Sequence, residues 1–149
     1  MGDTKIEAGV DNNAAGSAEA FQYTATATGT VNTLAIYVDA GSTATKVTVG
    51  LYSNTSSNNP GTLLGQATLA SPAAGAWNSL TVAAITVTTG TKYWIAVLTP
   101  SGSGTVQFRD VGTGGKSQGS SQTTLATLPA TWSPAASWAN SPMSAYAAP

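Results

Sequence analysis

Short runs of alternating apolar and polar residues constrain the fold of this chain more than any other feature of its sequence. Gly, Asn or Pro interrupts the runs about every dozen residues, which is the spacing of short strands joined by turns. Within residues 31–39, Leu34, Ile36 and Val38 share one face because side chains alternate with period two in a strand. No segment carries the apolar stripe of an amphipathic helix. The pattern therefore predicts an all-β chain.

We expect residues 1–149 to form a single domain with two antiparallel sheets, a β-sandwich of the jelly-roll type. Gly29 separates the first two predicted strands and predicts a hairpin between them. The Gly- and Ser-rich residues 112–121 and the stretch 125–138 are interpreted as long connections. The predicted strands are Phe21–Thr28, Val31–Asp39, Thr45–Tyr52, Leu63–Leu69, Trp77–Val82, Ile85–Val87, Lys92–Thr99, Thr105–Val111 and Met143–Ala147.

The alternation also assigns a face to each side chain. In the third predicted strand Val47, Val49 and Leu51 are expected to face the core, which leaves Thr48, Gly50 and Tyr52 on the outer face. In the strand of residues 92–99 the core face is expected to carry Tyr93, Ile95 and Val97, so that Trp94 points outward.

The composition excludes several kinds of chemistry. The chain has no Cys and no His, so disulfides, thiolate zinc sites and the commonest general base are absent. Only 7% of its residues are charged, with a net charge of -1, and the five Lys and Arg residues are scattered. No basic stripe or polybasic patch is present, so nucleic acid and membranes are not expected as partners. We expect a binding protein and not an enzyme.

The acidic residues leave two further hypotheses open. A glycoside-active enzyme would need two carboxyl groups across a cleft, and Asp110 with a second acid is the arrangement to consider. Asp11, Asn12 and Asn13 form a loop that could supply oxygen ligands to calcium, but Asp and Asn also form such turns without an ion. No calcium-ligand motif is present, so no cofactor is predicted.

Aromatic side chains are the best candidates for a binding site, because neutral proteins bind sugars through flat rings and hydrogen-bonding groups. Tyr37 and Tyr52 are expected on the outer faces of strands that are plausible neighbours. Trp77 is expected to cover the mouth of the core. Trp132 and Trp138 lie in a segment without alternation, where an indole is either a lid or a ligand platform. The candidate binding residues are Tyr37, Tyr52, Trp94, Gln107, Arg109, Trp132 and Trp138.

Four segments carry a resemblance to a known group of proteins: 50–52 (GLY), 60–64 (PGTLL), 75–78 (GAWN) and 90–97 (GTKYWIAV). With them the chain resembles the jelly-roll accessory modules of secreted bacterial polysaccharide-degrading and surface proteins, over roughly residues 20 to 110. The resemblance implies a secreted or extracellular module tethered to other domains. Such modules often hold calcium, but no ligand set matches here.

The function predicted from these observations is non-catalytic binding of a neutral polysaccharide, such as a β-glucan, cellulose or xylan. The alternative is a structural or adhesive β-sandwich of a multidomain surface protein, since one fold serves several functions.

Overall fold

A computed structural model describes residues 1–149 as an all-β chain of antiparallel strands. The strands are β1 (Gly9–Asn13), β2 (Ala18–Thr24), β3 (Gly29–Val38), β4 (Lys46–Asn54), β5 (Pro60–Ala70), β6 (Ala76–Val87), β7 (Lys92–Leu98), β8 (Val106–Asp110), β9 (Ser117–Ser120), β10 (Pro134–Trp138) and β11 (Ala145–Ala148). The chain contains no helix of the length and apolarity needed to cross a bilayer.

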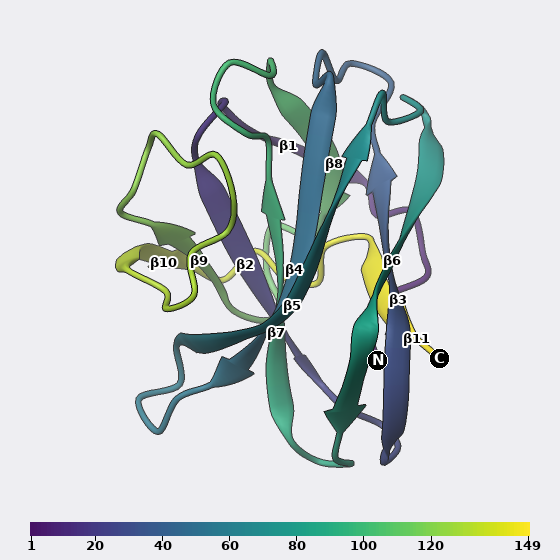
Figure 1. The fold of residues 1–149 in the computed structure, drawn as a ribbon, viewed down its shortest axis with the longest axis vertical. Helices are drawn as coiled ribbons and strands as arrows, with labels where there is room; N and C mark the ends of the chain where they lie inside the picture. Colours follow the sequence, from purple (N-terminus) through teal and green to yellow (C-terminus); the bar gives the residue numbers. More distant parts are fainter.

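The strands form two sheets (Figure 1). The first sheet has the order β1-β8-β3-β11, and β6 pairs with β3 as well. The second sheet has the order β10-β9-β2-β7-β4-β5. All the strand pairs are antiparallel, and the arrangement is consistent with the predicted β-sandwich.

The main core lies between the inner faces of the two sheets. Leu34, Ile36 and Val38 of β3 are fully buried in it, as the alternation predicts. The second sheet contributes its own inward residues, which are Val47, Val49, Leu51, Tyr93, Ile95 and Val97. These predicted core faces are confirmed. Each strand presents its apolar face inward because burying apolar side chains against the opposite sheet is favourable.

Two predictions about strand partners were wrong. The hairpin expected across Gly29 does not form, because β2 pairs with β7 and β9 while β3 pairs with β6, β8 and β11. The chain between β2 and β3 crosses from one sheet to the other. For the same reason β3 and β4, expected to be neighbours, lie in different sheets. Residues 76–87, expected as two strands, form one strand.

Three strands were missed by the alternation. β1, β9 and β10 are short, and β9 and β10 lie in segments rich in Gly, Ser, Pro and Ala that resembled loops. β9 pairs with β2, and β10 then pairs with β9 at the edge of the second sheet. β1 pairs with β8 at the edge of the first sheet. These additions extend both sheets on the same side of the molecule, where the candidate site lies.

The first residues of the chain pair with its last strand. Gly2 forms an antiparallel bridge with Tyr146, and the amino group of Met1 donates to the carbonyl of Ala147 over 3.0 Å. The two termini accordingly lie close together (Figure 1). Residues 1–3 therefore belong to the first sheet, although nothing in their sequence predicts a strand.

Candidate functional site

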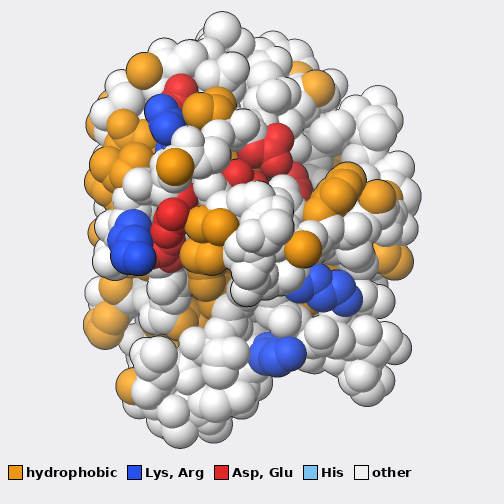
Figure 2. Space-filling view, turned by 180° about the vertical axis from the view of Figure 1, so that it is seen from behind, with side chains coloured by type: hydrophobic (Ala, Val, Ile, Leu, Met, Phe, Trp, Pro, Cys, Tyr) orange, Lys and Arg blue, Asp and Glu red, His pale blue; other side chains and the backbone are white.

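Three carboxyl groups from three strands gather where the two sheets part at the edge of the sandwich. Asp110 follows Phe108 by two positions on β8, and Asp11 is paired with Phe108 from β1, so both point to the core side of their sheet. Glu19 of β2 precedes Phe21 by two positions and points inward from the opposite sheet. Figure 2 shows Asp and Glu side chains gathered near the middle of this face.

Asn140 connects these acids to one another. Its Nδ2 lies 3.0 Å from Asp110 Oδ2 and 3.3 Å from Asp11 Oδ2, so both amide protons have acceptors. Its Oδ1 lies within hydrogen-bond distance of Ser117 Oγ on β9. The same Ser117 oxygen lies 2.7 Å from Glu19 Oε1. One amide and one hydroxyl therefore join all three carboxyl groups in a single network.

Burial and nearby negative charge raise the pKa of two of these carboxyl groups, Glu19 and Asp110. Burial is the largest cause that raises the pKa of Glu19 to about 7, the hydrogen bond to Ser117 opposes it, and the carboxylates of Asp11 and Asp110 raise it further. Burial, followed by the nearby Asp11, also raises the pKa of Asp110 above its usual value. The site therefore holds a carboxyl group that changes charge near neutral pH.

Trp138 borders this network with a half-exposed indole. Its side chain is 49% exposed, and the benzo ring lies over Gly119, where an added Cβ would come within 3.3 Å of the ring. Because Gly119 has no side chain, the indole can pack directly on the backbone of β9. Trp138 lines a cavity of about 390 Å³ whose other lining residues are Asp11, Asn12, Asn13, Glu19 and Asn140.

Three of the predicted binding residues are sealed from solvent. Tyr52 and Trp94 do face away from the main core as predicted, but both are fully buried, and Trp132 is only 5% exposed. The reason is that residues 125–132 fold over the outer face of the second sheet and form a second apolar cluster there. Tyr52 packs edge-on against Trp132 at 5.2 Å and donates its hydroxyl to Pro129 O. The expectation of exposed rings was wrong for Tyr52 and Trp94, whereas Trp132 takes the role of a lid, one of the two expected for it.

The other predicted residues lie on the outer face of the first sheet. Tyr37 is half-buried and packs edge-on against Trp77 of β6 at 5.9 Å, and Trp77 in turn meets Tyr146 of β11 at 5.3 Å. Trp77 thus joins a surface cluster and does not cover the mouth of the core. The ring planes cross at 71° and 51°, so the three rings do not form a flat platform.

Gln107 and Arg109 share that outer face on β8. Arg109 Nε donates to Asp39 Oδ2, and its Nη1 donates to the carbonyl of Ala8 over 3.2 Å. A hydrogen bond from Gly41 N and the pairing with Arg109 lower the pKa of Asp39. The guanidinium of Arg109 therefore links β8 to Asp39 and Ala8. The predicted set is divided among three places, and only Trp138 borders the carboxyl network.

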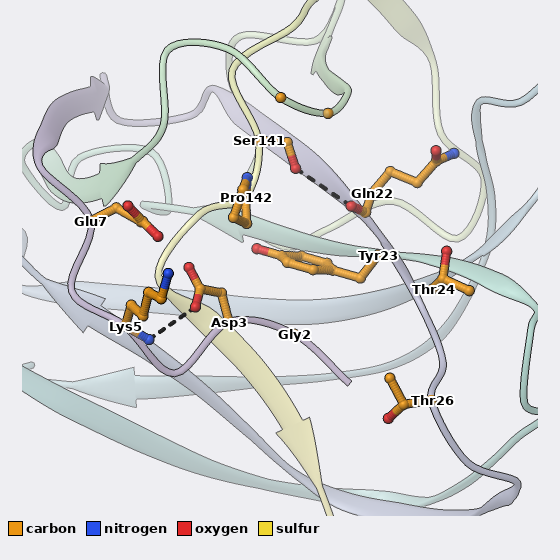
Figure 3. A pocket seen from close by; sticks show the side chains of 12 residues that line it. Gly2, Asp3, Lys5, Glu7, Gln22, Tyr23, Thr24, Thr26, Ser141 and Pro142 are labelled. Atoms are coloured by element: carbon orange, nitrogen blue, oxygen red, sulfur yellow. Dashed lines mark hydrogen bonds between the residues drawn. The ribbon is translucent and has the colours of Figure 1, made fainter.

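A second cavity of about 390 Å³ lies beside the first residues of the chain. Figure 3 shows Asp3, Lys5 and Glu7 on one side of it and Gln22 on the other. Its one aromatic residue, Tyr23, is buried, and its hydroxyl donates to Met143 O and accepts from Met143 N. This cavity offers charged and polar groups but no exposed ring, so it is the weaker candidate for binding a sugar.

Sequence reasoning missed Glu19 and Asn140 as parts of the site. Glu19 lies in a strand that shows no motif around it, and Asn140 stands in an irregular segment. The only available signal was alternation, because Glu19 occupies an inward position two residues before Phe21. No group of three or more acidic, His or Cys side chains is placed to hold a metal ion.

Comparison of the sequence with protein-family models and with characterised proteins finds no match.

Proposed function

We propose that this protein binds a neutral carbohydrate at the cavity beside Trp138, without changing it chemically. The observation that carries the proposal is the half-exposed indole of Trp138 on a cavity of about 390 Å³ that is otherwise lined by amide and carboxyl groups. A sugar presents a C–H face that stacks on an aromatic ring and hydroxyl groups that hydrogen-bond to amides and carboxylates. The cavity offers both kinds of contact.

The electrostatics of the cavity support a neutral ligand. Asp11 and Glu19 line it, and Asp110 lies behind Asn140, whereas no Lys or Arg is among its lining residues. Carboxylates accept hydrogen bonds from sugar hydroxyls, but they repel a uronate, sulfate or phosphate group. We therefore assign the ligand to neutral polysaccharides, with β-glucan, cellulose and xylan as the first classes to test.

Binding without catalysis is favoured over glycoside hydrolysis by the state of the acids. Asp11 and Asp110 both accept from Asn140, and Glu19 is only 5% exposed and bonded to Ser117. A hydrolase needs two carboxyl groups free to reach opposite sides of a glycosidic bond. Here Asp11 and Asp110 share the amide of Asn140, and Glu19 is bonded to Ser117, so these carboxyl groups are already occupied by hydrogen bonds within the protein.

The strand order supports a finer description of the fold. When β9, β10 and β11 are set aside, the two sheets have the orders β1-β8-β3-β6 and β2-β7-β4-β5. Each sheet then alternates strands from the two halves of the chain, as expected of a double Greek key wound into a jelly roll. We propose this jelly-roll topology and, with it, the role of an accessory module in a secreted protein.

Affinity electrophoresis in gels containing hydroxyethylcellulose, mixed-linkage β-glucan or xylan tests the proposed binding. We expect retardation by at least one polymer. Trp138→Ala should weaken the affinity by about fivefold to thirtyfold, because losing a stacked indole removes about 1–2 kcal/mol of contact. Trp77→Ala, which removes an indole on the outer face of the first sheet, is the matched control and should migrate like the wild type. Equal retardation of both variants, or none of the wild type, would reject this site.

The alternative, a structural or adhesive module, is favoured by one separate observation. Ile6 and Val10 are 53% and 54% exposed beside the unpaired edge of β1. Exposed apolar residues at a free strand edge favour pairing with another chain. A concentration-dependent dimer in analytical ultracentrifugation, dispersed by Val10→Lys, would support this second function.

A further inference from the structure

Ser117 has one hydroxyl proton, but its Oγ lies within hydrogen-bond distance of two acceptor oxygens. These are Glu19 Oε1 at 2.7 Å and Asn140 Oδ1. If Glu19 were ionised, Ser117 could donate to only one of them, and the other pair of oxygens would face each other without a proton. A carboxyl proton on Glu19 completes the chain, since Glu19 then donates to Ser117 and Ser117 donates to Asn140.

Turning the Asn140 amide over does not remove this requirement. Its Nδ2 has two protons, and both have carboxylate acceptors, at 3.0 Å on Asp110 and 3.3 Å on Asp11. The reversed amide would direct its oxygen at those two carboxylates. The orientation in which Oδ1 accepts from Ser117 therefore satisfies the most groups.

We propose that Glu19 is a neutral carboxylic acid in the binding-competent protein, that it positions Asn140 and Trp138, and that loss of its proton weakens carbohydrate binding. The binding part of this inference rests on the function proposed above. It makes Glu19 a positioning residue, which acts through Ser117 and Asn140.

The charges around Glu19 act in the same direction as the proton count. Asp11 of β1 and Asp110 of β8 are the charged groups that act on it, and both are acidic. From β9 and the segment after β10 it meets only the neutral Ser117 and Asn140. Ionised Glu19 would be a third negative charge in a poorly hydrated site with no cation to offset it.

The connection to Trp138 is short. Asn140 lies two residues beyond Trp138, the last residue of β10, and Ser137 of the same strand accepts from Gln118 Nε2 over 2.9 Å. The end of β10 is thus held by its backbone pairing with β9 at Ser137 and Trp138, by this side-chain bond, and by the Asn140 network just beyond the strand. If the network is broken, the indole still packs on Gly119, but the hydrogen bonds of Asn140, two residues after Trp138, are lost.

The protein has only two glutamates, Glu7 and Glu19, which makes a direct measurement simple. With side-chain ¹³C-labelled glutamate, NMR should show two carboxyl resonances. We expect one of them to titrate with a midpoint near pH 7 and to disappear in Glu19→Gln, and the Asn140 side-chain amide to shift with the same midpoint. Two glutamates that both titrate below pH 5, or an Asn140 amide that ignores the titration, would overturn the proposal.

The second arm measures binding to hydroxyethylcellulose, mixed-linkage β-glucan and xylan at pH 6 and pH 8.5. If only the protonated form binds, a pKa of about 7 leaves about 3% of the protein competent at pH 8.5, so the affinity should fall about thirtyfold. Glu19→Gln keeps a neutral donor toward Ser117 and should flatten this profile, whereas Glu7→Gln should keep it. An unchanged pH profile in Glu19→Gln would refute the proposed control.

The two arms separate the two proposals. If the wild type binds none of the polymers at either pH, the proposed function fails. The glutamate titration and the Asn140 shift then still decide whether the Glu19 proton positions the site.

Discussion

A carboxyl group enclosed by other acids is best accommodated as a neutral acid. Glu19 is 5% exposed and lies near Asp11 and Asp110, so its ionised form would lose hydration and gain repulsion. As a neutral acid it can donate one hydrogen bond, which a carboxylate cannot. In the proposed neutral state Glu19 donates this bond to Ser117 Oγ, which lies 2.7 Å from Glu19 Oε1. The chemistry of the network thus depends on the proton of one side chain.

This proton links the stability of the fold to pH. The pKa of Glu19 is about 7 in the folded protein against 4.5 for the free side chain, so the folded state binds the proton more tightly. The resulting stabilisation is complete below pH 4.5 and is lost as pH rises through 7. At about 1.4 kcal/mol per pKa unit it amounts to about 3 kcal/mol.

Urea unfolding from pH 4.5 to 8 measures this linkage. The free energy of unfolding of Glu19→Gln should lack the decline that Glu19 causes in the wild type, so the difference between the two proteins should change by about 3 kcal/mol across the range. Glu7→Gln serves as the reference. Parallel curves for the wild type and Glu19→Gln would contradict the raised pKa.

Only part of the site could be predicted from single residues. Trp138 stood out because an indole in a segment without alternation has no assigned burial, and it is the predicted residue that borders the network. Asp11 and Asp110 were considered separately and Glu19 was not. Their association could not be predicted, because residues 11, 19 and 110 come together only through the pairing of β1 with β8 and the packing of the sheets. Their spacing in the sequence contains no trace of that contact.

At the scale of elements, the segment 121–133 decides which aromatic rings are available. Leu125, Leu128 and Trp132 cover Tyr52 and Trp94 on the outer face of the second sheet. Gln66 of β5 holds the segment with both ends of its amide, since Nε2 donates to Leu128 O over 3.2 Å and Oε1 accepts from Leu128 N over 3.0 Å. The segment is therefore an integral cover of the sheet.

Truncating the centre of this cover should be costly. Leu128 is 2% exposed, and Leu128→Ala should lower the free energy of unfolding by about 2–5 kcal/mol, the usual range for a buried Leu. The matched control is Leu64→Ala on β5, where the side chain is 38% exposed and the change should be within about 0.5 kcal/mol. Thermal unfolding of the two variants measures the contrast, and equal losses would show that the cover contributes little.

The same cover explains why faces were predictable and exposure was not. Alternation correctly turned Tyr52 and Trp94 away from the main core, because the period of a strand is a local property. Whether an outward ring meets solvent depends on chain some 30 to 80 residues away in the sequence, which a local pattern cannot identify. The partners of each strand were hidden for the same reason, as the absent hairpin between β2 and β3 shows.

At the scale of the whole molecule, pairing between distant segments closes the fold. β1 pairs with β8, β3 pairs with β11, and the first residues pair with the last strand. Met1 also packs against the main core from this position. A chain held by such long-range pairs gains most of its contacts only when both ends are in place. The ends of the chain should therefore matter for stability.

Gly2 is the residue at which this closure is most sensitive. Its φ is +117°, and an added Cβ would lie 2.4 Å from Tyr146 Cα. Gly2→Val should therefore separate the first residues from β11, expose Met1 and lower the free energy of unfolding by about 1–3 kcal/mol. Gly29→Val is the matched control, because nothing lies within 4 Å of the corresponding position and its backbone is not left-handed. Chemical unfolding of both variants tests the point: a loss confined to Gly2→Val is expected if terminal pairing holds the sheet closed, and equal stability of the two would mean that the sheet does not depend on it.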